Sequence, residues 1–133
     1  MTDPRDVREN LPELERQVFT AVRQGPLLSV SEVTDRLAAD GRALAYTTVM
    51  TVLTRLWQKG YLDRQQEGRS YLYEALPEDD IRRELGGRAV REALAKFGTP
   101  ALTGFVRTLS PEQRALVATL LREQDDRESE DQP

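Results

Sequence analysis

The sequence predicts a mainly α-helical chain with a small antiparallel sheet, and two observations support this fold class. Apolar residues recur at three- and four-residue spacing in several segments, which is the pattern of amphipathic helices. Two segments of alternating apolar and polar residues flank Glu67-Gly68-Arg69, which is typical of a β-hairpin with a tight turn. The sequence therefore predicts mostly helices, and all the predicted strands lie before residue 75.

The composition excludes several classes of protein. Of the 133 residues, 38% are hydrophobic and 32% charged, and no segment approaches the roughly 20 apolar residues of a membrane span. With no cysteine and no histidine, the chain cannot form thiolate or imidazole metal sites or a Cys/His or Ser/His catalytic pair. We therefore expect no enzyme activity, no metal and no cofactor. The polar N-terminus is no signal peptide, and together with the lack of cysteine it predicts a cytoplasmic protein.

The charge is unevenly distributed along the chain. The net charge is −4, but residues 123–133 alone carry six acidic side chains and one basic side chain. Between Arg42 and Tyr73 there are five basic residues and two acidic ones. Attraction to phosphates acts within a Debye length of about 8–10 Å, so this local basic excess is compatible with a nucleic-acid partner.

Two helices and a short strand are expected before residue 45. Residues 1–10 are expected to be flexible. A first helix is predicted over residues 11–24, with Pro12 in its first turn and Gly25-Pro26 at its end. Its expected inward residues are Leu14, Val18, Ala21 and Val22.

The second helix is predicted to follow a strand at residues 27–30. Ser29 and Glu32 have the spacing of a capping box, but a strand that reaches Val30 leaves Ser31 as the expected N-cap. The helix is expected to end near Ala39, before a turn at residues 40–42. Its expected buried residues are Val33, Leu37 and Ala38.

Leu44–Gly60 carries the clearest helical pattern. Its apolar stripe consists of Val49, Val52, Leu53 and Leu56. The opposite face has no acidic residue and consists of Thr47, Thr48, Met50, Thr51, Thr54 and Arg55. Such a face fits an ordinary solvated helix, or a helix in the DNA major groove, where threonine can bond to phosphates and base edges and its methyl can contact thymine. The short turn before it gives a helix-turn-helix, which favours the second interpretation.

The hairpin completes a recognisable order of elements. Its strands are predicted at residues 61–66 and 70–74, and Leu28–Val30 is expected to add a third strand. The order helix, strand, helix, helix, hairpin over residues 11–76 is that of a winged helix-turn-helix domain. Arg69 at the hairpin tip is well placed for a phosphate or minor-groove contact, although a plain structural ribbon is the alternative.

Three helices are expected over residues 77–124, after Leu76-Pro77. Gly86-Gly87 in the first of them indicates either a bend or the close approach of a second chain. About 45 residues cannot bury this many apolar side chains alone, so the segment packs on the winged helix or pairs with a second copy. We favour a homodimer, because two recognition helices can then bind a palindrome. The expected interface residues are Ile81, Leu85, Leu94, Phe97, Leu102, Phe105, Val106, Leu116 and Leu120. Residues 125–133 are expected to form a disordered acidic tail.

A family resemblance adds to these expectations. Ala45–Leu56, followed by Lys59-Gly60 and by Gly68–Tyr73, resembles the penicillinase-repressor family, which includes the beta-lactamase, methicillin-resistance and copper-transport repressors of bacteria. The resemblance covers about residues 10–123. It implies a homodimeric winged-helix repressor that binds inverted repeats in promoters and dimerises through its C-terminal helices.

The resemblance also bears on regulation. In relatives induced by beta-lactams, a membrane sensor protease cleaves the C-terminal region, and by position the bond would be Gly104-Phe105. Methicillin-type repressors have asparagine where this chain has Gly104. Copper-sensing relatives use a C-terminal cysteine cluster, which this chain lacks.

The expected function is therefore that of a repressor that binds DNA through the helix at residues 45–59 and a wing at residues 67–70. The expected DNA contacts are Tyr46, Thr47, Thr48, Met50, Thr51, Arg55 and Arg69. Arg55 is expected to touch the DNA backbone or to pair with a carboxylate of the fold, and Trp57 is expected to pack. The alternative is a winged-helix module for protein interaction without specific DNA binding. A third hypothesis, an effector pocket between the domains, is disfavoured because only 6% of residues are aromatic.

Overall fold

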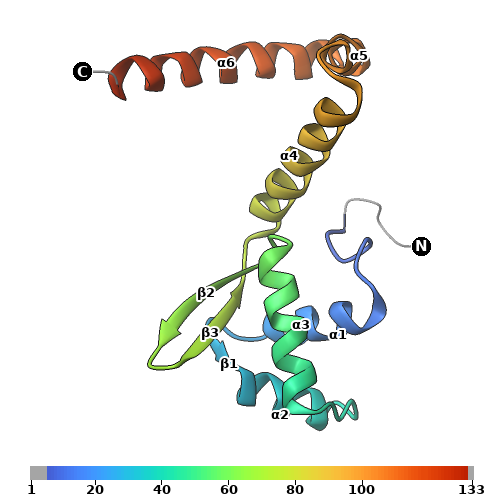
Figure 1. The fold of residues 1–133 in the computed structure, drawn as a ribbon, viewed down its shortest axis with the longest axis vertical. Helices are drawn as coiled ribbons and strands as arrows, with labels where there is room; N and C mark the ends of the chain where they lie inside the picture. The colour runs from blue at the N-terminus through green and yellow to red at the C-terminus, as the bar shows by residue number, and fades with distance from the viewer. Residues whose placement is uncertain (1–5, 132–133) are drawn as a thin grey trace. The chain divides into compact units, whose positions relative to one another are not determined.

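The computed structural model describes residues 6–131, in two compact units. The first unit ends at Arg88 and the second begins at Ala89. The chain order is α1 (Glu13–Val22), β1 (Leu28–Ser29), α2 (Val30–Ala39), α3 (Tyr46–Gln58), β2 (Leu62–Glu67), β3 (Ser70–Ala75), α4 (Glu78–Phe97), α5 (Pro100–Thr108) and α6 (Pro111–Asp131) (Figure 1). The mainly helical fold with one small sheet is confirmed.

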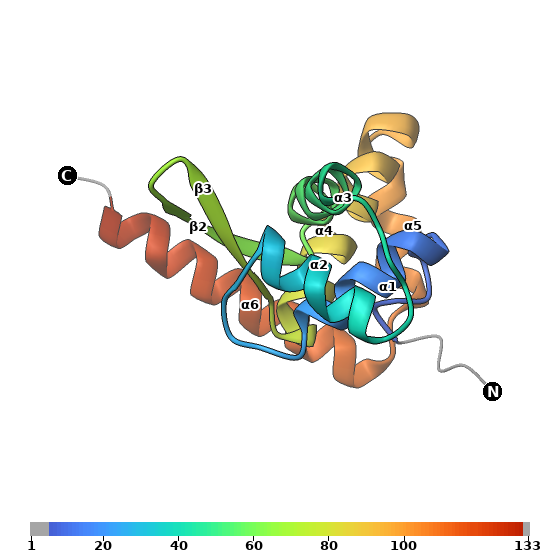
Figure 2. The same cartoon turned by 90° about the horizontal axis from the view of Figure 1, so that it is seen from below.

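The sheet is antiparallel with the strand order β1-β3-β2. Leu28 pairs with Tyr73 on one side of β3, and Arg64 pairs with Tyr73 on the other. The two-residue turn between Glu67 and Ser70 begins with Gly68 at φ 61°, the positive φ that a tight hairpin turn requires. The hairpin projects away from the three helices of its unit (Figures 1 and 2). The predicted winged helix-turn-helix is therefore present.

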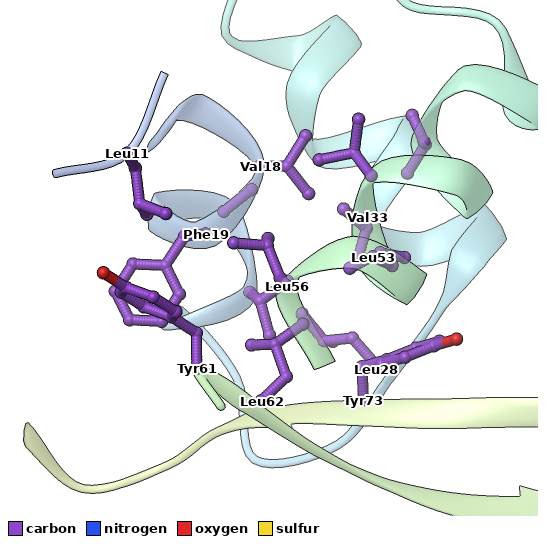
Figure 3. Close-up of a cluster of buried hydrophobic side chains, with 14 of the residues drawn as sticks. Leu11, Val18, Phe19, Leu28, Val33, Leu53, Leu56, Tyr61, Leu62 and Tyr73 are labelled. Carbon is purple, nitrogen blue, oxygen red and sulfur yellow. The ribbon is translucent and has the colours of Figure 1, made fainter. Parts of the chain in front are cut away.

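The first unit encloses one hydrophobic core between the three helices and the sheet. Phe19 of α1 packs edge-on against Tyr61, with ring centroids 5.5 Å apart (Figure 3). The buried apolar residues are Val7, Leu11, Val18, Phe19, Ala21, Val22, Leu28, Val30, Val33, Leu37, Val49, Val52, Leu53, Leu56, Tyr61, Leu62, Tyr73 and Ile81. Every element of the unit therefore contributes to the core that positions α3.

The core includes the start of α4, so the expected boundary at residue 76 is wrong. Ile81 has an exposed fraction of 0% and belongs to the core of the first unit, and Leu85 packs against that core. A side chain that is fully buried within its own unit cannot contact a second copy. Ile81 is therefore a core residue rather than the interface residue that we expected.

The N-terminal segment is also better anchored than we expected. Val7 and Leu11 are buried, and the Tyr61 hydroxyl donates a hydrogen bond of 2.8 Å to the Val7 carbonyl. This contact joins residues 54 positions apart, so no local pattern could indicate it. The prediction of flexibility is wrong for residues 6–10, and residues 1–5 lie outside the described part of the chain.

Three local predictions need correction. The capping box is centred on Ser29, whose hydroxyl accepts from the Glu32 N–H at 3.1 Å, because β1 ends one residue earlier than expected. Leu14 and Ala38 are exposed, whereas Phe19 fills the inward position on α1. The acidic tail is helical as far as Asp131, because it continues α6 with good helix formers such as glutamate, glutamine and arginine.

Other predictions of the C-terminal half are confirmed. α4, α5 and α6 are the three helices expected after Leu76-Pro77, and Ser110 and Gln113 form a capping box at the start of α6 with bonds of 2.9 and 3.1 Å. α4 runs without interruption through Gly86-Gly87. Among the described residues, no helix is long and apolar enough to cross a membrane.

Candidate nucleic-acid interface

α3 is held by the buried stripe that the sequence predicted. Val49, Val52, Leu53 and Leu56 are all buried. Gly60 ends the helix at φ 91°, with Tyr61 N–H bonded to the Leu56 carbonyl at 3.0 Å and Gly60 N–H to the Trp57 carbonyl at 3.1 Å. This pair of bonds is the Schellman motif, in which glycine adopts the left-handed conformation. Burial of one face and the Schellman motif at the C-terminal end therefore fix the position of α3 in the first unit.

A second anchor joins α3 to α1. The Lys59 ammonium, at the C-cap of α3, lies 2.5 Å from the Glu15 carboxylate, whose side chain is 8% exposed. Because Glu15 is nearly buried, this ion pair is screened less by solvent than a surface pair. The ion pair therefore links the C-terminal end of α3 to α1.

The opposite face of α3 lies between two hollows of about 300 Å³ each. The hollow toward the hairpin, which we call the wing-side hollow, is lined by Val30, Tyr46, Met50, Thr54, Arg64, Arg69, Ser70, Tyr71 and Tyr73. The hollow toward α1, which we call the α1-side hollow, is lined by Leu14, Thr47, Thr48, Thr51, Val52 and Arg55. All seven predicted DNA contacts therefore line one hollow or the other, and neither hollow contains an acidic residue.

The exposed side chains of this face differ in what they can offer. Tyr46 is 47% and Met50 43% exposed, so an aromatic ring with a hydroxyl and a flexible thioether both face solvent. Thr51 donates its hydroxyl proton to the Thr47 carbonyl at 3.0 Å. In this rotamer the Thr51 oxygen is left as an acceptor, as a base amino group requires, rather than as a donor to phosphate. The structure thus refines the chemistry that the sequence suggested for Thr51.

Arg55 and Arg69 remain unpaired within the described part of the chain. Neither guanidinium forms an ion pair or hydrogen bond there, although arginines elsewhere in the first unit, such as Arg8 and Arg23, pair with carboxylates. Arg69 occupies the turn of the wing and lines the wing-side hollow together with Met50 of α3. The wing turn and the exposed face of α3 therefore border the same hollow.

Arg64 was not among the predicted contacts, but it also lines the wing-side hollow. This residue lies on β2, and its guanidinium carbon is 3.5 Å from the ring centroid of Trp57 and 3.9 Å from that of Tyr71. Trp57, which we expected to pack, is 36% exposed and stacks on Arg64 outside the hydrophobic core. The three side chains meet only because β2 pairs with β3 and α3 docks on the sheet. In the sequence, the arginine is separated from both rings by several residues, so no local pattern indicates the stack.

The second unit presents a different surface. None of its described residues is buried, and it exposes the large apolar side chains Val90, Phe97, Leu102, Phe105, Val106, Leu116, Leu120 and Leu121. Of the expected interface residues in this unit, Leu94 is half-buried and the others are exposed, with Phe97 reaching 64%. Leu102, Thr103, Val106 and Arg107 line a further hollow of about 390 Å³. The unit therefore has no core of its own within residues 89–131.

The fold and the exposed face of α3 define a winged-helix protein. The sequence matches the profile described as penicillinase repressor over residues 11–123, and the chain belongs to this family. No sequence among the curated proteins matches the chain. The family is one of transcriptional regulators.

Several solved structures are similar to the chain. BpsR of Bordetella bronchiseptica, whose DNA binding is regulated by 6-hydroxynicotinic acid, is 24% identical over 89% of this chain and 77% of its own, with a TM-score of 0.44. The PcaV transcriptional regulator of Streptomyces coelicolor, in complex with its natural ligand, is 24% identical over the same shares, with a TM-score of 0.45. A mutant MarR from E. coli complexed with operator DNA is 14% identical over 86% and 75%, with a TM-score of 0.45.

Proposed function

We propose that the chain is a homodimeric repressor that binds inverted-repeat operator DNA through α3 and the wing turn at residues 67–70. The observation that carries this proposal is the placement of all seven predicted contacts along the two hollows beside the exposed face of α3. The surface combines unpaired arginines with threonines and one methionine, which suit phosphates, base edges and thymine methyls respectively. A carboxylate here would repel the DNA backbone, and neither hollow contains one.

Titration of labelled duplexes followed by fluorescence anisotropy tests DNA binding. One duplex carries the region upstream of the gene, and the control duplex has the same composition in scrambled order. We expect the specific complex to be at least about 10³-fold tighter at physiological salt, and both affinities to fall steeply between about 50 and 200 mM salt. Absence of binding at low salt would contradict the proposal and favour the protein-interaction module.

The homodimer is the second part of the proposal, and the second unit supports it. Its exposed leucines, phenylalanines and valines lie within 45 residues that bury none of them alone. So many exposed large apolar side chains in one unit favour an interaction site. A second copy is the occupant we propose, because the family resemblance implies dimers and a palindromic operator requires two recognition helices.

Sedimentation analysis of Phe105→Asp tests the dimer. The side chain is 46% exposed, so the substitution leaves the first unit intact and places a charge on the apolar surface. We expect a monomer at concentrations at which the wild type is a dimer. Arg114→Asp, at an exposed polar position of α6, is the matched control and should remain dimeric. An unchanged mass of the Phe105 variant would remove this segment from the interface.

Release by a membrane sensor protease is the third part of the proposal. The Gly104-Phe105 bond is exposed and lies inside α5, so cleavage would divide the apolar surface of the second unit. Since the bond is helical, α5 must unwind locally before an extended chain can enter a protease cleft. Mass spectrometry after co-expression with a candidate protease should find termini at residues 104 and 105. Gly104→Ala, which meets no atom within 4 Å, should slow cleavage by strengthening the helix.

A further inference from the structure

Arg64 differs from the other arginines of the first unit in how its side chain is held. Its guanidinium lies between the Trp57 ring of α3 and the Tyr71 ring of β3, at 3.5 and 3.9 Å from their centroids. Stacking of this kind is favourable because the ring faces attract the cation. The planar group is thus immobilised between the recognition helix and the wing.

When a guanidinium stacks on aromatic rings, the edge that carries its N–H donors stays available for hydrogen bonds. Five N–H donors lie along that edge, in a fork that matches two oxygens of a carboxylate or phosphate. Within the described part of the chain the Arg64 side chain has no hydrogen bond or ion pair, and the nearby Asp63 carboxylate accepts from the Arg64 backbone N–H instead. The sheet pairing also orients Arg64 away from Asp63, because successive side chains on a strand point to opposite faces.

The wing-side hollow is the depression next to these donors. Arg64 lines this hollow together with Arg69, Ser70 and the exposed Tyr46, and no acidic residue lines it. Two guanidinium groups and hydroxyl donors around one depression of about 300 Å³ are suited to an oxyanion such as a phosphate.

We propose that the wing-side hollow binds a phosphate of the DNA backbone, with Arg64 as its preorganised bidentate donor. The inference rests on the proposed function, and it adds a contact that positions the duplex between α3 and the wing. Because the rings hold the guanidinium before binding, little side-chain freedom is lost when the phosphate arrives. The contact concerns the backbone, so it strengthens binding to every sequence equally.

Salt dependence separates this role from a structural one. Each phosphate contact adds about 0.9 to the slope of log affinity against log salt, so Arg64→Gln should lower the slope by about 0.9. We expect its affinity at physiological salt to fall about ten-fold on both operator and scrambled duplexes.

Arg64→Lys should keep the slope while losing affinity, because it retains the charge without the fork. Arg36→Gln, on α2 and outside both hollows, is the matched control and should change neither quantity.

Trp57 supplies an independent readout, because it is the only tryptophan and it touches Arg64. Its emission should change on titration with duplex DNA and, at millimolar concentration, with inorganic phosphate, and the phosphate effect should vanish in Arg64→Gln. If the wild type binds no DNA, the proposed function fails, while a phosphate effect lost in Arg64→Gln would assign the site to a free anion instead. Wild-type DNA binding with an unchanged slope in folded Arg64→Gln would overturn this inference alone.

Discussion

Arg88 donates a hydrogen bond of 2.8 Å from Nη2 to the main-chain carbonyl of Gln58, the last residue of α3. The cation therefore lies at the negative end of the α3 dipole and satisfies one of the carbonyls that a helix end leaves free. Glu84, one turn earlier on α4, holds the Arg88 guanidinium at 2.9 Å. The start of α4 thus caps the helix that carries the candidate DNA-binding face.

Arg88→Ala should destabilise the first unit. The lost hydrogen bond and dipole interaction together amount to about 1 kcal/mol, since the group is partly exposed to solvent. Thermal unfolding followed by circular dichroism should show a fall in Tm of a few degrees. Arg91→Ala, at an exposed position on the same helix, removes the same charge without the cap. Equal losses in the two variants would show that the cap contributes nothing.

Gly60→Ala should be more damaging than an alanine at another glycine with positive φ. The Gly60 backbone is at φ 91°, and an added Cβ would lie 2.5 Å from the Glu84 Cγ. Gly41→Ala is the matched control, because it has φ 80° and no atom within 4 Å. We expect about 1 kcal/mol for Gly41→Ala and a larger loss for Gly60→Ala by chemical denaturation. Adding Glu84→Ala should recover only the part of the loss that comes from the close contact.

Gly86→Ala tests whether a second chain packs closely at the Gly86-Gly87 pair. Gly86 lies within α4, and an added Cβ would meet nothing within 4 Å of the chain itself. An isolated helix should therefore gain about 0.5–1 kcal/mol in its free energy of unfolding. If a second copy packs closely here, the same change would weaken self-association, which sedimentation at several concentrations would detect.

Tyr61→Phe should change the dependence of stability on pH. Burial, with a further contribution from the Glu15 charge, raises the pKa of the Tyr61 phenol above its usual value of about 10. The folded state therefore favours the protonated phenol, and this stabilisation is complete below pH about 10 and is lost as pH rises through the raised pKa. Below pH 10 the variant should be about 1 kcal/mol less stable, because its hydrogen bond to Val7 is missing.

The difference between wild type and Tyr61→Phe should shrink as pH rises above about 10. Denaturant unfolding at several pH values measures it, and ultraviolet titration of the phenolate reports the ionisation directly. A stability difference that stays constant above pH 10 would contradict the raised pKa.

Thr51→Val should reduce operator specificity without unfolding α3. The change keeps the branched shape and a methyl group but removes the hydroxyl oxygen that faces solvent while its proton bonds the Thr47 carbonyl. We expect about ten-fold weaker binding to operator and little change on scrambled DNA, since a base contact is lost and not a phosphate contact. Thr119→Val removes a hydroxyl with the same bonding to the preceding turn on α6 and should leave DNA binding unchanged. Equal weakening on both duplexes would make Thr51 a backbone contact.

The sequence by itself determined the local elements of this protein, because their signals are local. The apolar spacing of α3, the glycine that ends it at residue 60 and the turn at Gly68-Arg69 each depend on neighbouring residues. The family resemblance is densest over this same stretch. The seven candidate contacts could therefore be named in advance, because they follow from the face of one helix and the tip of one hairpin.

Only the tertiary structure decided which distant side chains meet. Ile81 belongs to the core and not to an interface, because the first turns of α4 dock on the winged helix. Val7 is held by Tyr61, and Arg64 lies between Trp57 and Tyr71, through contacts that join separate elements. Hydrophobic periodicity indicates that a side chain is covered, but not by which element. Which element covers a side chain depends on long-range packing between segments, and the pattern within one segment carries no information about that packing.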